Sequence, residues 1–168
     1  MNEDALERLL HLHRGLPRAA PGGEAHTLAA LERIPDLPLR PRIVDLGCGP
    51  GGQTLDLLRA IEGSTVVAVD LLPEMLAELE ARATRAGLRD RVTLVRGDVA
   101  EPPPEVHPAS FHLAWSEGAA YAMGFDAALR AWRHLLLPGG FIAVSELAWT
   151  VPVADRPALA RDFFAEEH

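Results

Sequence analysis

The sequence predicts an open, doubly wound α/β fold, and three observations support this prediction. From residue 42 onward, short apolar segments alternate with longer segments that have helical periodicity. The short segments are apolar on both faces, as expected for strands that are covered by helices on both sides of a sheet. The segments between them are long enough for right-handed crossovers, so the strands are expected to lie parallel.

The composition is that of a globular domain with an acidic surface. The 168 residues are 48% apolar and 24% charged, which suits a single domain with an ordinary core. The net charge is −8, and every one of the 16 basic residues is arginine. Because nucleic-acid binding requires a basic face, we expect no nucleic-acid partner.

The lack of a recognisable targeting signal in the sequence favours the cytoplasm. No apolar run approaches the length of about 20 residues that a membrane helix needs, so we expect no membrane association. The acidic start over residues 1–4 lacks the features of a signal peptide. The single cysteine, Cys48, has no internal partner for a disulfide, which fits a reducing compartment.

The first 41 residues are expected to form an N-terminal helical arm on a core of residues 42–168. Apolar residues at helical spacing predict helices over residues 1–12 and 24–34. Glycines and prolines separate these helices, and three further prolines end the second. Arg14 and Arg18 flank the intervening linker, which could fold over the carboxylate of a bound cofactor, but we expect both arginines to be solvated at the surface.

The core elements follow in alternation, each with its own local signal. Strands are expected over residues 43–46, 65–70, 92–95, 111–116 and 141–144, which are short and apolar or β-branched. Helices are expected over residues 53–61, 73–86, 125–137 and 156–167, where apolar residues recur on one side. Pro73 suits a first helical turn, Gly87 ends that helix, and Pro138 with two glycines ends the next.

A glycine-rich loop follows the first strand and opens into a helix. Such a loop lets the backbone approach a ligand closely, although a tight turn without a ligand has the same appearance. Gly47, Gly49 and Gly52, with Asp70 downstream, fit the fingerprint of dinucleotide-binding proteins. An NAD(P)-dependent oxidoreductase is therefore one interpretation of this loop.

Residues 45–52 (DLGCGPGG) also resemble the glycine-rich motif of class I S-adenosylmethionine-dependent methyltransferases, which have a Rossmann-like fold. Three other segments resemble that family: Asp70 at the end of the second strand, residues 97–99 after the third, and residues 135–141 before the fifth. The resemblance implies an S-adenosylmethionine cofactor, with Asp70 on the ribose hydroxyls and Asp98 near the adenine amino group. The cofactor-binding residues that it implies are Asp45, Gly47, Cys48, Gly49, Gly51, Asp70, Leu71, Asp98, Val99 and Trp115, the last of which also suits core packing.

Residues 21–23, 115–119 and 145–149 are similar to bacterial small-molecule methyltransferases of the ubiquinone- and menaquinone-biosynthesis type. This similarity implies methyl transfer to a small-molecule acceptor by direct in-line displacement. Such a displacement needs orientation and proximity rather than a protein nucleophile.

An acceptor with an O–H or N–H group would be helped by a base. Glu117 is our candidate for that base, with Tyr121 as its neighbour in the pocket, and the alternative role for Glu117 is to cap a helix or shape the loop. His112 stands where the family has an acid, and we expect it to face solvent or a sheet edge. The histidines are not spaced as metal ligands, so no metal site is expected.

The family's sheet has seven strands, whereas this sequence predicts only five. The fold is therefore expected to lack the last two strands, with an exposed edge at the strand over residues 141–144. A truncated chain explains this edge, and a homodimer formed through it is the alternative. A non-catalytic module that binds S-adenosylmethionine is a second interpretation of a chain without these strands.

Overall fold

The computed structural model describes residues 15–155, 157 and 158. The helix expected over residues 1–12 and Arg14 lie outside the described residues, as does nearly all of the helix expected over residues 156–167. Among the described residues, no helix is both long enough and apolar enough to cross a membrane.

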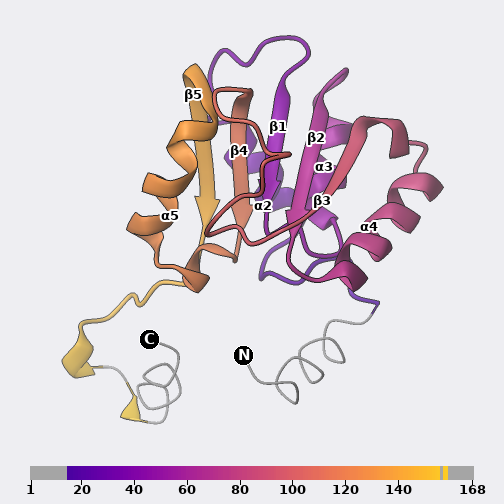
Figure 1. Cartoon of the computed structure of the whole chain (residues 1–168). Coiled ribbons are helices and arrows are strands. Elements are labelled where there is room, and N and C mark those ends of the chain that lie inside the picture. The colour runs from indigo at the N-terminus through magenta and orange to yellow at the C-terminus, as the bar shows by residue number, and fades with distance from the viewer. Residues whose placement is uncertain (1–14, 156, 159–168) are drawn as a thin grey trace.

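Five parallel strands form one sheet in the order β3-β2-β1-β4-β5 (Figure 1). They are β1 (Arg42–Leu46), β2 (Thr65–Asp70), β3 (Val92–Arg96), β4 (Phe111–Glu117) and β5 (Leu136–Ser145). The chain builds outward from β1 to β3 and then returns to place β4 on the other side of β1. The point where the strand order reverses therefore lies between β1 and β4, and ligands bind at such points in open α/β sheets.

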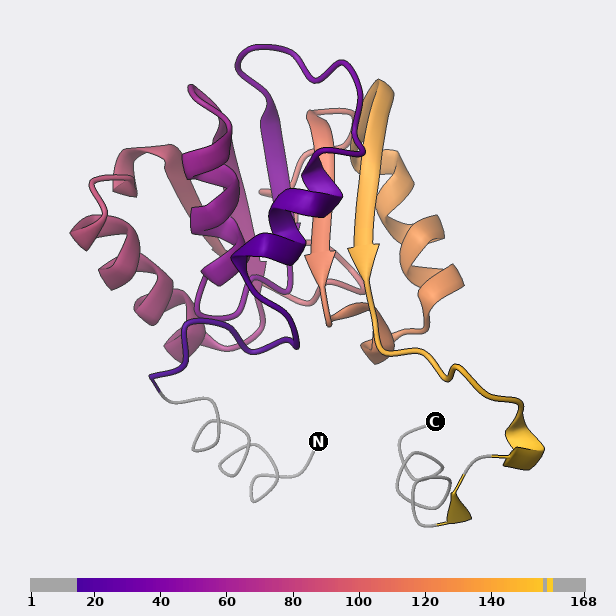
Figure 2. The same ribbon diagram turned by 180° about the vertical axis from the view of Figure 1, so that it is seen from behind.

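Helices cover both faces of the sheet, as Figures 1 and 2 show from opposite sides. The helices α2 (Glu24–Leu31), α3 (Gly52–Ala60) and α4 (Pro73–Arg85) lie on one face, where Leu58 and Leu79 are fully buried. The helix α5 (Phe125–Trp132) and the loop between β3 and β4 cover the other face, where Trp132 is fully buried. The predicted doubly wound, Rossmann-like α/β fold is thus confirmed.

The boundary between α5 and β5 differs from the prediction of a helix to residue 137 and a strand from 141. The helix α5 ends at Trp132, the 3-10 turn Arg133–Leu135 follows, and β5 already begins at Leu136. Pro138 would stop a helix only next to itself, so it does not account for an end at Trp132. Leu136 pairs instead with Phe111, and an irregularity in the β4–β5 pairing takes up the residues before Phe141.

The strand β5 forms one edge of the sheet within the described part of the chain. The side chains of residues 141–144 are only half-buried there. The described sheet thus has five strands and lacks the last two of the seven-stranded methyltransferase fold, as predicted. Because all five strands are parallel, the loops at their carboxyl ends lie along the same edge, and these loops form the site described next.

Candidate functional site

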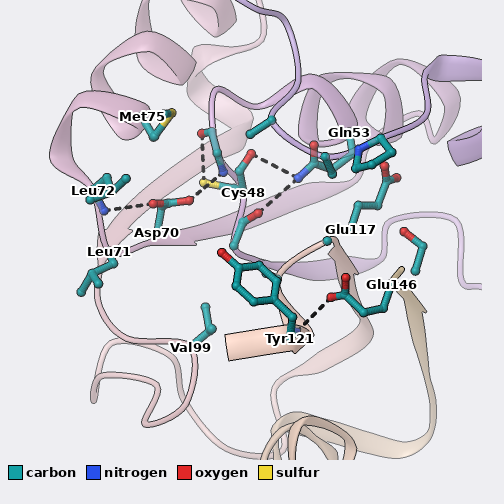
Figure 3. A pocket seen from close by; sticks show the side chains of 18 of the residues that line it. Cys48, Gln53, Asp70, Leu71, Leu72, Met75, Val99, Glu117, Tyr121 and Glu146 are labelled. Atoms are coloured by element: carbon teal, nitrogen blue, oxygen red, sulfur yellow. Dashed lines mark hydrogen bonds between the residues drawn. The ribbon is translucent and has the colours of Figure 1, made fainter. Parts of the chain in front are cut away.

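A cavity of about 460 Å³ lies at the carboxyl ends of the strands (Figure 3). Its volume falls within the range of about 300–1,000 Å³ that small-molecule sites occupy. The loops after all five strands contribute to its wall, together with residues 19–21 from the segment before α2. The cavity therefore spans the point where the strand order reverses.

The glycine-rich loop after β1 fits between two neighbouring segments, which leave no space for a side chain at Gly47 or Gly51. Gly47 has a φ of +77°, and a Cβ atom there would lie 2.3 Å from the Cβ of Ala119 in the loop after β4. Gly51 has a φ of +83°, and its Cβ would lie 2.1 Å from Cδ1 of Leu79 on α4. Of the predicted glycines, Gly47 and Gly49 line the cavity, whereas Gly51 lies behind them at the start of α3.

Asp70 at the end of β2 joins the glycine loop to the loop after β2. Its Oδ2 accepts a hydrogen bond of 2.8 Å from the Gly49 N–H, and its Oδ1 accepts one of 2.9 Å from the Leu72 N–H. Burial raises the pKa of this carboxyl above its ordinary value, although the backbone hydrogen bonds oppose that shift. Each oxygen keeps a second lone pair, so the carboxylate can accept two vicinal hydroxyl groups from the cavity side.

Asp45, also a predicted cofactor ligand, lies beneath the glycine loop and is not among the residues that line the cavity. Its carboxyl accepts hydrogen bonds from the Thr54 hydroxyl at 2.5 Å and from Nε2 of Gln53 at 3.4 Å. Complete burial is the main cause that raises the pKa of Asp45 to about 7. In the structure, Asp45 therefore connects the end of β1 to the first turn of α3.

The loops after β2 and β3 form a mainly apolar side of the cavity. Leu71 and Val99 line it as predicted, and Met75 of α4 lies beside them. Asp98 also lines it, and its Oδ1 accepts a hydrogen bond from the Ala100 N–H at 2.8 Å. The Val99 carbonyl accepts a hydrogen bond of 2.7 Å from Nε1 of Trp132, which holds this loop against α5.

Glu117 at the end of β4 reaches the cavity but is already heavily engaged. Its Oε1 accepts hydrogen bonds from the Thr27 hydroxyl at 2.8 Å and from Nε1 of Trp115 at 2.9 Å, and its Oε2 accepts one from the Arg18 guanidinium. A base would have to take up a proton while paired with that cation. Trp115 is buried and absent from the cavity lining, so the structure places it in the core beside Glu117.

Tyr121 and Glu146 lie on the side of the cavity that is farther from Asp70 (Figure 3). Glu146 Oε2 accepts a hydrogen bond of 3.0 Å from the Tyr121 N–H, and its Oε1 accepts one of 2.9 Å from the Leu147 N–H. The carboxylate therefore holds the loops after β4 and β5 together. The side chain of Tyr121 is 55% exposed at the mouth of the cavity.

Cys48 and His112 have no position suited to catalysis. The Cys48 side chain is fully buried, and that burial raises the pKa of its thiol well above the ordinary value, so it stays protonated. His112 lies at the opposite end of β4, where its Nδ1 accepts a hydrogen bond of 3.0 Å from the Arg42 N–H. His112 is half-buried and β4 is an inner strand, so His112 is not at a sheet edge, one of the two positions expected for it.

Sequence reasoning missed several residues of this region. Arg18 was expected to be solvated, but it is only 8% exposed and forms ion pairs with Asp56 and Glu117. Gln53 was not singled out, although its Nε2 donates a hydrogen bond of 3.1 Å to the Cys48 carbonyl. Nothing in the local pattern around Arg18 signals burial, because its partners are distant in the sequence. The glycine motif leads directly into the helix that carries Gln53, so the motif could have indicated Gln53 as a residue of the site.

The charge of the cavity has one sign. Among the described residues that line it, the charged side chains are Asp70, Asp98, Glu117 and Glu146, and arginine is not among them. Such a lining favours a cationic ligand and opposes a polyanion. It also opposes the pyrophosphate of NAD(P), since the Gly49 N–H that would face a phosphate already donates to Asp70.

Comparisons with known proteins agree with this architecture. The sequence model of the methyltransferase domain family matches residues 43–140, which is more than half of the chain. Among solved structures, an S-adenosylmethionine-dependent methyltransferase from Geobacter sulfurreducens in complex with S-adenosylhomocysteine superposes with a TM-score of 0.73. The two are 26% identical, and the match covers 95% of this chain and 61% of the other.

Curated relatives are similar over shorter segments. A probable cobalt-precorrin-6B C(15)-methyltransferase from Methanothermobacter thermautotrophicus is 34% identical over 104 residues, which cover 62% of this chain and 51% of the relative. A trans-aconitate 2-methyltransferase from Mycobacterium sp. (strain KMS) is 36% identical over 110 residues, which cover 64% of this chain and 42% of the relative. The chain thus spans about half the length of these relatives or less. By its sequence match and its fold, the chain belongs to the methyltransferase domain family, in the class I, S-adenosylmethionine-dependent group.

Proposed function

We propose that this chain binds S-adenosylmethionine in the cavity and transfers its methyl group to a small-molecule acceptor. The observation that carries the proposal is the Asp70 carboxylate at the end of β2, which faces the cavity while its two oxygens accept the Gly49 and Leu72 N–H groups. When bound, the cofactor supplies a methyl group on a positively charged sulfur, which an acceptor displaces in line. The family match supports this activity, and relatives of which the match covers about half or less carry it in their names.

The residues present fit that cofactor. Asp70 offers two carboxylate oxygens to a ribose, and Asp98 offers an acceptor to an adenine amino group. Leu71, Met75 and Val99 provide apolar contacts for a flat base. The lining carboxylates that are not paired with Arg18, which are Asp70, Asp98 and Glu146, favour the positive sulfur and ammonium groups of the methionine end.

The acceptor side is formed by the loops after β4 and β5. Tyr121 supplies an aromatic ring and a hydroxyl at the mouth, and Glu146 holds its backbone in place. Tyr121 is therefore the better placed of the two predicted catalytic residues, because Glu117 is engaged with Arg18. A direct displacement asks the protein chiefly to hold the two reactants in line.

The charged residues that line the cavity indicate which kinds of acceptor can bind there. The residues that line the acceptor side include Glu117 and Glu146 and, within the described part of the chain, no arginine. We infer that the acceptor is neutral or cationic, unlike the anion for which the trans-aconitate relatives are named. The expected result is methyl transfer to amines or neutral acceptors and none to trans-aconitate, and efficient methylation of trans-aconitate would contradict this inference.

Thermal unfolding with four ligands tests the cofactor. S-adenosylmethionine and S-adenosylhomocysteine at about one hundred times their Kd should each stabilise the protein by about 2.7 kcal/mol. For a domain of this size the Tm should rise by about 5–10 °C, whereas NAD and NADP should leave it unchanged. A rise with NAD alone would instead support the oxidoreductase interpretation. Cofactor binding without methyl transfer to any acceptor would support the non-catalytic module.

Three finer predictions from the sequence belong to this proposal. They are membership of the ubiquinone- and menaquinone-biosynthesis-type subgroup, action in the cytoplasm, and pairing of two copies through the exposed edge of β5. The half-buried side chains of residues 141–144 support the third. Light scattering on the purified protein should give the mass of a dimer, and a monomer at high concentration would exclude this pairing.

A further inference from the structure

The segment before α2 forms one wall of the cavity. Residues 17–21, here called the strap, run past the carboxyl ends of the strands (Figure 2), and Ala19, Ala20 and Pro21 line the cavity. The strap belongs to no helix or strand, so specific contacts are needed to hold it there. The structure contains two sets of such contacts.

Arg18 provides the first set through one buried guanidinium. Its Nη1 donates to Glu117 Oε2 at the end of β4, and its Nη2 donates to Asp56 Oδ2 on α3 at 2.7 Å and to the Thr27 hydroxyl on α2 at 3.1 Å. The side chains of Arg18, Asp56 and Glu117 are all 10% exposed or less. Removal of one partner from such a buried ion-pair network leaves the others without compensation, which is strongly unfavourable.

Close backbone contacts provide the second set. A Cβ atom on Gly52 would lie 2.6 Å from the Pro17 carbonyl oxygen, and one on Gly118 would lie 2.8 Å from the Cβ of Ala20. Nη1 of Arg82 donates to the carbonyl oxygens of both Pro17 and Pro50, at 2.5 and 2.7 Å. The strap is thus fitted against the glycine loop and against the turn after β4.

We propose that Arg18 is a positioning residue that holds the strap closed over the cofactor, with the Arg18–Glu117 ion pair as its latch. This inference rests on the proposed function, since it takes the cofactor as the group that the strap covers. Opening of the latch then speeds release of the cofactor, because the strap forms part of the cavity wall. Glu117 has the role of an anchor for Arg18 rather than that of a base.

The latch explains why an arginine is buried beside two carboxylates at the edge of a ligand cavity. A closed strap excludes water from the methyl donor, which strengthens the electrostatic contacts within the site. Opening of the strap then becomes part of ligand exchange, as in other enzymes whose lids close on their substrates. Asp56 and Thr27 hold the same guanidinium, so the strap is released fully only when Arg18 leaves Glu117 and these two partners as well.

The test compares Arg18→Met with Arg59→Met as its matched control. Arg59 contacts Asp56 from the solvent side at 3.4 Å, and no contact between its side chain and the strap is recorded among the described residues. Binding of S-adenosylhomocysteine is measured by calorimetry and stopped flow, and hydrogen exchange is followed at the strap amides of residues 18–20. We expect Arg18→Met to weaken binding about 10- to 100-fold with faster release and to speed strap exchange. Arg59→Met should stay within twofold of the wild type, and Arg18→Lys should restore part of the affinity.

Each further outcome also decides the inference. Arg18→Met with wild-type affinity and wild-type strap exchange overturns it, and so does faster exchange that extends equally through β1 and α3, since that indicates general loosening. If Arg18→Met does not fold, Glu117→Gln keeps the shape and removes the charge, and it should weaken binding about 3- to 10-fold with faster strap exchange. If the wild type itself fails to bind S-adenosylhomocysteine, the proposed function is wrong. Exchange in the ligand-free protein then still decides whether Arg18 holds the strap.

Discussion

Asp70 accepts a hydrogen bond of 2.8 Å from the backbone N–H of Gly49. Asp70 is the last residue of β2, whereas Gly49 lies in the loop after β1. The same carboxylate faces the cavity. One side chain therefore shapes the glycine loop and presents oxygens to a ligand. These two tasks make Asp70 the most informative single position for the proposed cofactor.

Replacement of Asp70 by asparagine should separate these two tasks. The asparagine amide has one accepting oxygen and no negative charge, so we expect S-adenosylhomocysteine to bind about 10- to 100-fold more weakly, corresponding to about 1.5–3 kcal/mol. Calorimetric titration measures the Kd. Asp90→Asn, an exposed aspartate on the 3-10 turn Arg89–Arg91, is the control and should not change it. Equal affinity for Asp70→Asn and the wild type would reject the assignment of Asp70 to the cofactor.

Gly51→Ala should destabilise the fold far more than Gly87→Ala. Both glycines have positive φ values, +83° and +69°, so both substitutions carry the cost of about 1–2 kcal/mol for a left-handed alanine. Only at Gly51 would the new Cβ also collide with a neighbour, Leu79, whereas at Gly87 it meets nothing within 4 Å. Urea unfolding should show a loss that is greater for Gly51→Ala by at least about 1 kcal/mol. Equal losses would show that backbone strain alone governs both positions.

Asp45→Asn should change the pH dependence of stability. Burial raises the pKa of Asp45 from 3.8 to about 7 in the native state, so between about pH 4 and pH 7 the native state holds a proton that the unfolded state has released. The stability linked to the neutral carboxyl is therefore fully present below about pH 4 and is lost as the pH rises through 7. Relative to Asp45→Asn, the wild type should lose up to about 4 kcal/mol across this window. Urea unfolding at several pH values measures the difference, and parallel curves for the two proteins would contradict a neutral Asp45.

Tyr121→Phe should affect methyl transfer and spare cofactor binding. The substitution keeps the ring at the mouth of the cavity and removes the hydroxyl. If that hydroxyl assists the loss of a proton from the acceptor, kcat should fall about 10- to 100-fold. The Kd of S-adenosylhomocysteine should stay within twofold, because the substitution leaves Asp70, Asp98 and the glycine loop unchanged. An unchanged kcat with an identified acceptor would remove Tyr121 from the catalytic residues.

The sequence predicted the sheet well because its signals are local. The apolar strands, the glycine loop after β1 and the acid at the end of β2 each lie within a few residues, and their order predicts the parallel topology. The end of α5 was misplaced because Leu136 is satisfied by pairing with Phe111, a partner that no local pattern reveals. Pro138 and the two glycines after it were used as the stop signal for this helix, but they act only on adjacent residues and give no sign of an end at Trp132.

The site was predicted less completely, and for a related reason. Asp70 and Asp98 line the cavity as expected, because strand ends of a parallel sheet meet at one edge. Asp45 lies next to the glycines in sequence, but the chain direction at the end of β1 turns its side chain under the loop toward Thr54. Arg18 was missed because its contact with Glu117 spans 99 residues, and only the folded chain brings the two together.

The burial of Cys48 makes it a built-in chemical reporter. It is the single cysteine of the sequence, its side chain is fully buried, and its N–H donates to the Val69 carbonyl at 2.9 Å. A thiol reagent can therefore modify this sequence at one place only, and only in molecules whose glycine loop has moved enough to expose the Cys48 thiol. The rate of that modification therefore measures how often the loop opens, and the measurement needs no spectroscopic label and no engineered residue.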